Sequence, residues 1–231
     1  MPGKQKLLVQ MIVRNESKRY LKQVLSSIVE YADKIIILDD VSTDDTLELC
    51  RKFPKVSIHC RTGKSLWATD EAKLRGELWE IVRKVAKKEK FSWILTQDFD
   101  ELFDKSFKKR LPELLGSNYD TVAFRLCDMW NPTHYRIDGY WSPTFKRLFR
   151  FKDVPFGLIG KFHCGPIPRY AIETNNCTCF IDIRVKHFAW ATPEDRKAKM
   201  KIREKVPVTG INAEHRESVF KPARLKNGLK K

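Results

Sequence analysis

Four short strand-like runs, separated by helical patterns, constrain the fold of the first half of the chain. The runs cover residues 7–13, 34–38, 56–60 and 93–97. The first two are almost wholly apolar and too short for helices, which predicts strands that are buried on both faces, as in a parallel sheet. Between the runs, apolar side chains recur at helical spacing, as in Leu21, Val24, Leu25 and Ile28. This alternation predicts right-handed βαβ units in a doubly wound α/β sheet.

The composition and the hydrophobic pattern of the sequence change after about Ser117. Strand-like segments at residues 121–126, 147–151 and 180–185 lie among long loops rich in Pro, Gly, Asn and aromatic residues. A helix is predicted from Thr192, which is followed by a proline and two acidic residues, to about Val206. We therefore expect one compound domain, with a βαβ half at residues 1–116 and an irregular half at residues 117–231.

The chain is strongly basic. Its 231 residues carry 45 Lys and Arg against 29 Asp and Glu, a net charge of +16, and most of the excess lies in the irregular half. Such a charge predicts anionic partners, such as nucleotide phosphates, an acidic acceptor, acidic lipid or nucleic acid. A nucleic-acid-binding protein is therefore an alternative class, although no RNA-binding, zinc-finger or helix–turn–helix signature occurs.

Targeting and cysteine patterns predict a cytoplasmic protein. No apolar run approaches the roughly 18 residues of a membrane span, and the first residues lack the apolar region of a secretory signal. The six cysteines are then expected to be reduced. An alternative interpretation is a zinc site, formed by Cys177 and Cys179 together with His163, Cys164 and His187. Their single-residue spacing is closer than zinc knuckles use, and the alternating pattern around them favours a strand.

Acidic and polar residues follow three of the predicted strands. Asn15 and Glu16 follow the first strand, Asp39 and Asp40 the second, and Asp98, Asp100 and Glu101 the fourth. Turns and helix starts also favour such residues. However, two carboxylates spaced i, i+2 after a buried strand repel one another unless a cation separates them, and carboxylate oxygens suit Mg²⁺ or Mn²⁺. Ligands of open α/β sheets bind at the carboxyl ends of strands, so metal-dependent phosphate chemistry is predicted there, with a nucleotidyltransferase as one alternative.

Three blocks in this order resemble the signatures of family 2 glycosyltransferases with the GT-A fold. They are Met11–Glu16, Ile37–Thr46 with its D-D-x-S-x-D-x-T pattern, and Trp93–Glu101 with its D-x-D motif. Val41 stands where glycine is commoner in the family. The resemblance covers residues 7–101 well and residues 120–206 loosely. It implies a Rossmann-like, mostly parallel central sheet flanked by helices, followed by an irregular acceptor-binding half.

The resemblance also implies a nucleotide-sugar donor, most often a UDP-sugar, and inversion at the anomeric carbon. Carried onto this sequence, it places Asp39 on the base, Asn15 and Glu16 in the nucleoside pocket, and Arg75 on the base or phosphate. Without the resemblance, Arg75 would be expected on the surface of its helix and Glu101 at the start of one.

A divalent Mn²⁺ or Mg²⁺ ion is the cofactor that the resemblance implies. Asp98 would contact the ribose or the metal, and Asp100 would bind the metal that bridges the diphosphate. His187, in the run His187–Trp190, matches a histidine that many relatives use as a third contact to the metal or diphosphate. Such an ion neutralises the negative charge that develops on a diphosphate leaving group.

An inverting transferase also needs a general base to deprotonate the acceptor hydroxyl or thiol. The family usually takes this base from the second half of the chain. Asp138 is the first candidate, because its aromatic surroundings would raise its pKa, and Asp128 is the second. Asp153 and Glu173 are further candidates.

The acceptor class stays open among a glycan, a lipid-linked sugar, a peptide and a small metabolite. The segment from Phe220 to Lys231 is basic and contains no acidic residue. It is either a solvated terminus, as chain ends often are, or it holds an anionic acceptor or an acidic membrane surface near the site. The second alternative predicts peripheral contact with the inner face of a membrane.

Overall fold

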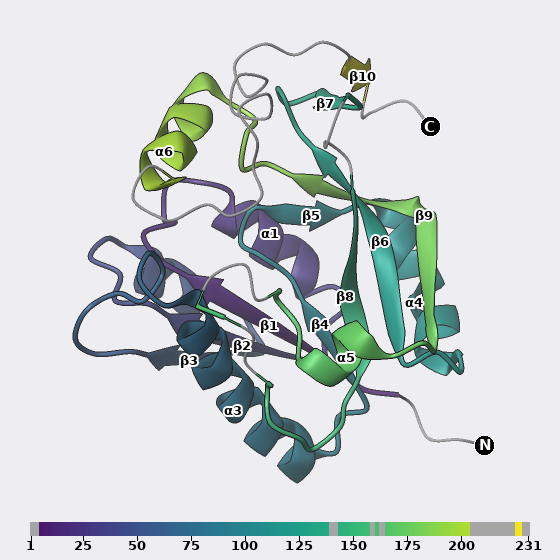
Figure 1. Cartoon of the computed structure of the whole chain (residues 1–231). Helices are drawn as coiled ribbons and strands as arrows, with labels where there is room; N and C mark the ends of the chain where they lie inside the picture. The colour runs from purple at the N-terminus through teal and green to yellow at the C-terminus, as the bar shows by residue number, and fades with distance from the viewer. Residues whose placement is uncertain (1–4, 139–142, 158–159, 162–164, 204–224, 228–231) are drawn as a thin grey trace.

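An eight-stranded mixed sheet runs through the computed structural model, which describes residues 5–138, 143–157, 160–161, 165–203 and 225–227 (Figure 1). Its strands are β1 (Leu7–Val13), β2 (Lys34–Asp39), β3 (Val56–Cys60), β4 (Trp93–Thr96), β5 (Glu101–Phe103), β6 (Thr121–Asp128), β8 (Thr144–Arg150) and β9 (Cys177–His187). They lie in the order β3-β2-β1-β4-β8-β6-β9-β5. A second, two-stranded sheet pairs β7 (His134–Arg136) with β10 (Leu225–Asn227).

The four strands β1 to β4 pair in parallel, so their carboxyl ends meet at one edge of the sheet. Val13 at the end of β1 lies opposite Asp39 at the end of β2. The polar residues that follow these two strands are therefore neighbours in space. Strand β8 pairs antiparallel with β4, so both halves of the chain contribute to one sheet.

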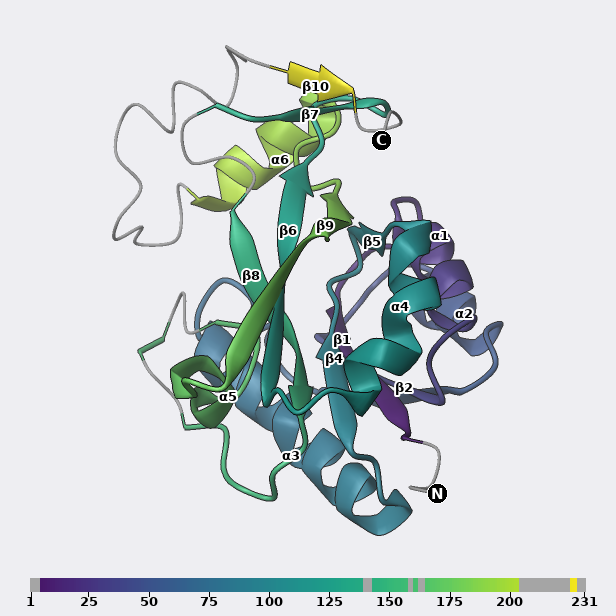
Figure 2. The ribbon, with the colours of Figure 1, turned by 90° about the vertical axis from the view of Figure 1, so that its right-hand side faces the viewer.

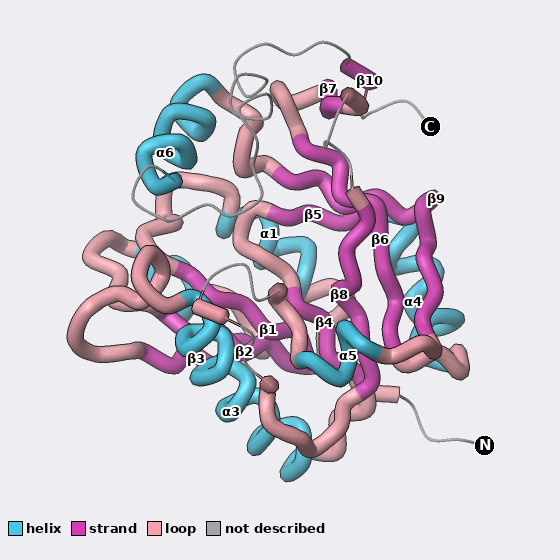
Figure 3. The backbone as a smooth tube through the Cα atoms, in the orientation of Figure 1, coloured by secondary structure: helices cyan, strands magenta, loops and turns pink. Residues whose placement is uncertain are grey.

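Helices cover both faces of the sheet. They are α1 (Leu21–Ile28), α2 (Thr46–Arg51), α3 (Glu71–Glu89), α4 (Lys105–Gly116), α5 (Arg169–Glu173) and α6 (Pro193–Arg203). Figure 2 shows α1, α2 and α4 on one side of the sheet and α3 and α5 on the other. Helix α6 lies beyond one end of the sheet, near the β7–β10 pair, which is visible in Figure 3.

Strand β1 requires a helical layer on each face. Its side chains alternate between two cores: Leu7, Val9, Met11 and Val13 pack with α1 and α4, whereas Leu8 and Ile12 pack with α3. Each of these six side chains is at most 3% exposed. Burying one of them stabilises the fold by roughly 1.5–3 kcal/mol. A strand that is apolar on both faces is therefore stable only between two layers.

The predicted first-half strands and the doubly wound sheet are confirmed. The last of these strands ends at Thr96 instead of Gln97. The chain between β2 and β3 contains the short helix α2. In the second half, the three predicted strands correspond to the longer β6, β8 and β9.

Five elements are additional to those that the sequence predicts: β5, α4, β7, α5 and β10. The three strands among them have three residues each, too few for an alternating pattern. Helix α4 has an apolar face, but Pro112 stands inside it and removes a backbone donor, which normally ends a helix. Strand β10 belongs to the basic C-terminal segment, whose other residues lie outside the described ranges, as does the predicted end of α6 at Val206. Among the described residues, no helix is long and apolar enough to cross a membrane.

Val41 adopts a left-handed backbone conformation, with φ of 62°. It sits in the turn that leaves β2, where the resemblance expects glycine. A β-branched residue is strained in this region. The turn is held by polar contacts on either side of Val41: the backbone N–H of Ser42 donates to Asp39 at 3.0 Å, and that of Asn15 donates to Ser42 Oγ at 3.0 Å. These contacts impose a conformation that Val41 itself disfavours.

Replacing Val41 with glycine should raise the free energy of unfolding by about 1 kcal/mol. Relief of backbone strain exceeds the entropy that glycine adds to the unfolded chain. Urea denaturation of the two proteins measures the difference. As a matched control, Val56→Gly at the start of β3 should lower the free energy of unfolding by about 1 kcal/mol or more, since it removes a partly buried side chain from a strand. A Val41→Gly variant less stable than the native chain would contradict the strain argument.

Candidate active site

A cavity of about 310 Å³ lies at the carboxyl edge of the parallel strands. Residues that follow β1 and β4 line it from the first half of the chain, and α6 lines it from the second half. Its lining includes Asn15, Glu16, Phe99, Asp100, Asp195 and Lys199. The structure therefore brings three of the predicted site residues, Asn15, Glu16 and Asp100, to one cavity.

Asp39 lies close to Asn15, because the loops that follow β1 and β2 contact one another. The side-chain oxygen of Asn15 accepts the backbone N–H of Thr43 at 2.7 Å, and Oδ2 of Asp39 accepts that of Ser42 at 3.0 Å. The other Asp39 oxygen, Oδ1, is buried and has no hydrogen-bond partner within the described part of the chain. A buried acceptor without a partner costs free energy. Oδ1 is therefore suited to accept a hydrogen bond from a ligand.

Asp40, the neighbour of Asp39, orders the loop that carries Trp67 to the cavity. Its carboxylate accepts the hydroxyl of Ser65 at 2.6 Å and the backbone N–H groups of Leu66 and Trp67 at 3.1 and 3.0 Å, and it pairs with Arg61 at 2.6 Å. Burial alone would raise the pKa of Asp40, but these donors outweigh it and hold the pKa below its ordinary value. Trp67 itself lines the cavity.

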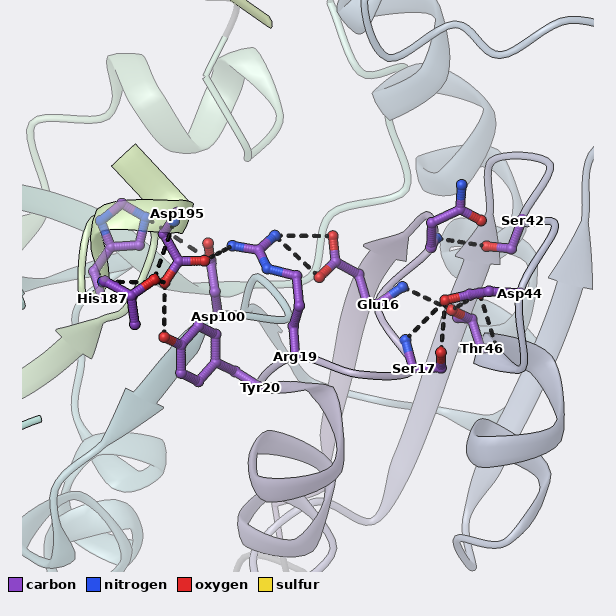
Figure 4. Close-up of polar contacts among 12 residues, drawn as sticks. Glu16, Ser17, Arg19, Tyr20, Ser42, Asp44, Thr46, Asp100, His187 and Asp195 are labelled. Carbon is purple, nitrogen blue, oxygen red and sulfur yellow. Dashed lines mark hydrogen bonds and ion pairs between the residues drawn. The ribbon is translucent and has the colours of Figure 1, made fainter. Parts of the chain in front are cut away.

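Asp195, in the first turn of α6, joins the two halves of the chain at the cavity (Figure 4). It accepts hydrogen bonds from the hydroxyl of Tyr20 at 2.8 Å and from Nη2 of Arg19 at 2.9 Å, and Nη1 of Arg19 contacts Glu16 at 3.2 Å. The hydroxyl of Thr192 also donates to Asp195, at 2.9 Å, which confirms the predicted cap of this helix. Burial alone would raise the pKa of Asp195, but these donors hold it below its ordinary value.

Glu16 is a buried carboxyl group of the cavity, with 5% of its surface exposed. Its backbone N–H donates to the hydroxyl of Thr46 at 2.7 Å, which fixes its position at the end of β1. Burial raises the pKa of Glu16 to about 8, although the nearby Arg19 acts to lower it. Glu16 therefore holds a proton near neutral pH and can donate a hydrogen bond to a ligand oxygen.

Asp100, His187 and Asp128 converge beside the cavity. His187 Nδ1 lies 2.6 Å from Asp128 Oδ1, and His187 Nε2 lies 3.8 Å from Asp100 Oδ1. The sheet produces this arrangement: Asp128 and His187 are register partners at the ends of β6 and β9, and the N–H of Phe188 donates to the carbonyl of Asp100 at 2.8 Å. Burial alone would lower the pKa of His187, but the two carboxylates outweigh it and raise the pKa.

The Asp100–His187–Asp128 arrangement fits a divalent cation. A histidine that binds a metal through one ring nitrogen usually holds a carboxylate, a carbonyl or water with the other, and His187 has such a carboxylate in Asp128. Asp100 and His187 would supply two ligands, and phosphate oxygens with water would complete the shell. In the described ranges, no group of three or more His, Cys, Asp or Glu side chains could hold a metal by itself. For the zinc alternative, Cys177 and Cys179 are exposed free thiols, and His163 and Cys164 lie outside those ranges.

Asp98 is held among buried cations. Nη2 of Arg147, on β8, lies 3.7 Å from Asp98 and also contacts Glu101. Burial alone would raise the pKa of Asp98, but the charges of Arg147, Arg75 and His187 outweigh it and hold the pKa below its ordinary value. Arg75 is only 9% exposed, so its interpretation as a surface residue is wrong. Glu101 is fully buried in β5, so its interpretation as the start of a helix is also wrong.

Neither candidate base lines the cavity. Asp128 is engaged by His187. Asp138 accepts a hydrogen bond from Nε of Arg136 at 2.8 Å, and Arg136 is fully buried against the ring of Trp130. Strand β10 holds this segment, because Leu225 pairs with Arg136. The further candidates contact surface cations: Asp153 lies 2.7 Å from Lys87, and Glu173 lies 2.7 Å from Arg169.

Seven lining residues are absent from the predicted site. Two of them stand inside the motif blocks, Arg14 and Phe99, and five stand outside: Arg19, Trp67, Asp195, Ala198 and Lys199. The position of Arg19, just after Asn15 and Glu16, was the available signal for it. Asp195 has a complete local explanation as a helix-capping residue, so the sequence gives no sign of its second role. Trp67 and Lys199 lie outside the three motif blocks.

The family model of glycosyl transferase family 2 matches residues 9–174, a span that contains the first-half site residues and Asp128. The chain belongs to glycosyl transferase family 2. The chain is 27% identical over 202 residues to the SPbeta prophage-derived glycosyltransferase SunS of Bacillus subtilis strain 168, and equally to glycosyltransferase SunS of Bacillus phage SPbeta. These matches cover 86% of the chain but only 43% of each relative.

Solved structures similar to this chain include a 4-diphosphocytidyl-2C-methyl-D-erythritol synthase, with a TM-score of 0.42 and 16% identity over 64% of this chain and 76% of that chain. Another is glucosyl-3-phosphoglycerate synthase from Mycobacterium tuberculosis in complex with Mn²⁺, UDP and glucosyl-3-phosphoglycerate. Its TM-score is 0.37, with 19% identity over 53% of this chain and 44% of that chain.

Replacing Asp195 with asparagine should lower the free energy of unfolding at pH 7 by about 2 kcal/mol, because hydrogen bonds to a charged group are lost. The folded-state pKa of Asp195 lies below its unfolded value of 3.8. Its contribution is therefore full above that value and is lost as the pH falls through the folded-state pKa. Urea denaturation between pH 7 and pH 3 should show the native and variant stabilities converging below about pH 4.

Asp182→Asn is the matched control for this charge change. Asp182 pairs with Arg110 at an exposed position, where its side chain is 65% accessible. Such a pair contributes less than about 1 kcal/mol, so the control should stay close to the native stability. A stability difference for Asp195→Asn that does not change with pH would contradict the role given to its charge.

Proposed function

We propose that the chain transfers a sugar from a UDP-sugar to an acceptor hydroxyl or thiol, with inversion at the anomeric carbon and with the help of a divalent metal ion. The convergence of Asp100 and His187, oriented by Asp128, beside the cavity that Asn15 and Glu16 line is the observation that carries this proposal. Membership of glycosyl transferase family 2 supports the reaction class.

The preference for a uracil nucleotide follows from Asp39. Its buried Oδ1 is an acceptor without a partner among the residues described here. Uracil carries an N–H donor at its ring position 3, whereas cytosine carries an acceptor at the same position. An ionised carboxylate at this point therefore favours uracil. Asn15 and Glu16 would line the adjacent nucleoside pocket.

The first-half acids and arginines would hold the diphosphate and the sugar. When bound, Mn²⁺ or Mg²⁺ supplies a Lewis acid that neutralises charge on the diphosphate, and Asp100 and His187 are the residues that would hold it. Asp128 fixes the ring of His187. Arg147 and Arg75 keep Asp98 ionised, so that its carboxylate can accept hydrogen bonds from hydroxyl groups of the donor.

We assign the general base to Asp138. Inversion requires one carboxylate on the acceptor side to take the proton of the attacking hydroxyl or thiol. Both candidates are paired, Asp128 with His187 at 2.6 Å and Asp138 with Arg136 at 2.8 Å. The partner of Asp128 belongs to the proposed metal site, which gives Asp128 a positioning role. Asp138 belongs to the segment between β7 and β8, in the half of the chain assigned to the acceptor.

Asp100→Asn should abolish the Mn²⁺-dependent part of UDP binding, because one of the two protein ligands of the metal is lost. Calorimetric titration of UDP with and without Mn²⁺ measures this, and the thermal unfolding midpoint reports on the fold. Asp182→Asn should bind UDP as the native chain does. Metal-dependent UDP binding that survives in Asp100→Asn would refute the metal site. A thermal shift of the native chain with an oligonucleotide, and none with UDP and Mn²⁺, would instead favour the nucleic-acid-binding alternative.

Asp138→Asn should lower kcat by about a hundredfold or more and leave the affinity for UDP unchanged, since a general base acts only in the chemical step. Asp128→Asn should instead weaken metal-dependent UDP binding, because His187 loses its orienting partner. Steady-state kinetics with the sugar nucleotide that the native chain consumes, combined with UDP titration, separates the two outcomes. If Asp128→Asn lowers kcat alone and Asp138→Asn does not, the base is Asp128.

A further inference from the structure

Helix α6 contributes a positive charge to a cavity that is also lined by the carboxyl groups of Glu16, Asp100 and Asp195 and by Arg14 and Arg19 of the first half. Ala198 and Lys199 line the cavity on this helix, whereas Lys197 and Lys201 are exposed and are not part of the lining. The position of α6 is fixed by Asp195, through Tyr20 and Arg19 of the first half. The tertiary contacts of α6 therefore determine that Lys199 lies at the cavity.

The surroundings of Lys199 leave its charge available to a ligand. Its ammonium group lies 5.3 Å from the centre of the Trp190 ring, a cation–π contact that steadies the side chain without neutralising it. Within the described part of the chain, no carboxylate forms an ion pair with Lys199 at 4.0 Å or less. Lys199 and Asp100 line the same cavity, so Lys199 is close to the predicted metal and diphosphate position.

A diphosphate at this position needs more positive charge than the metal supplies. Among the described residues, Arg147 is already paired with Asp98 and Glu101, and Arg19 with Glu16 and Asp195. A divalent ion beside Asp100 therefore offsets only part of the charge of the nucleotide, and the cations of the lining that remain for the diphosphate are Lys199 and Arg14. In a partly buried cavity, uncompensated negative charge is costly. A lysine that reaches the same space compensates the remainder, and it does so most strongly when the diphosphate leaves with its full charge.

We propose that Lys199 is a catalytic residue that binds the diphosphate of the donor nucleotide and stabilises the charge that develops on it as the sugar is transferred. This role rests on the proposed function. The three motif blocks assign donor binding to the first half of the chain. The proposal adds a contribution from α6, which belongs to the second half.

The test compares uridine with its two phosphorylated forms, UMP and UDP. Each compound is titrated calorimetrically in the presence of Mn²⁺. Lys199→Ala should weaken UDP binding about tenfold or more, because a charged hydrogen bond is lost, and should leave uridine binding unchanged. Lys199→Arg should restore UDP binding to within about threefold of the native value. Lys197→Ala, the matched control on the same helix, should bind all three ligands as the native chain does.

The outcomes separate this proposal from the function on which it rests. If the native chain binds UDP with Mn²⁺ and Lys199→Ala binds it equally well, Lys199 has no role at the diphosphate, and the proposed function stands. Equal weakening of uridine and UDP would also overturn the proposal, since it would mean that the substitution disturbs the nucleoside pocket. If the native chain fails to bind UDP with Mn²⁺, the proposed function and this inference both fail.

Discussion

The cavity exists in its present form because one carboxylate, that of Asp195, joins α6 to the loop after β1. It accepts hydrogen bonds from Tyr20 and Arg19 of the first half and from Thr192 of its own helix. The ring of Tyr20 also stacks on that of Phe188, with centroids 4.7 Å apart, and adds an apolar contact at the same junction. The same carboxylate orients Arg19 toward Glu16 (Figure 4), so the junction between the halves and the lining of the cavity are one polar network.

The edge of the sheet tolerates an unusual number of buried carboxyl groups, each for a different reason. Asp40 is stabilised by backbone and side-chain donors of the loop that carries Trp67, and Glu101 by Arg147. Glu16 is accommodated by holding a proton near neutral pH, since burial raises its pKa. A buried charge is stable only when it is paired or hydrogen-bonded. Among the residues that the structure describes, Asp39 has one oxygen without a hydrogen-bond partner, so this position favours a ligand that donates a hydrogen bond.

The proposed metal site is shared between the halves of the chain. Asp100 comes from the turn after β4, whereas His187 and Asp128 come from the register of β9 against β6. Binding of the donor and the metal would therefore also strengthen the contact between residues 117–231 and residues 1–116. In the same way, the proposed role of Lys199 brings a residue of the second half to the diphosphate.

The sequence by itself determined the parallel sheet, because short apolar runs such as Leu7–Val13 can be buried only between two helical layers. It also determined that Asn15, Glu16, Asp39 and Asp100 share one edge, since parallel strands end on the same side. It could not predict α4, in which tertiary packing overrides Pro112, or the short strands β5, β7 and β10. Only the tertiary structure decided that Asp195 reaches Tyr20 and that Asp128 pairs with His187. Those contacts depend on strand register and helix docking over 175 and 59 residues of chain, a separation that no local pattern encodes.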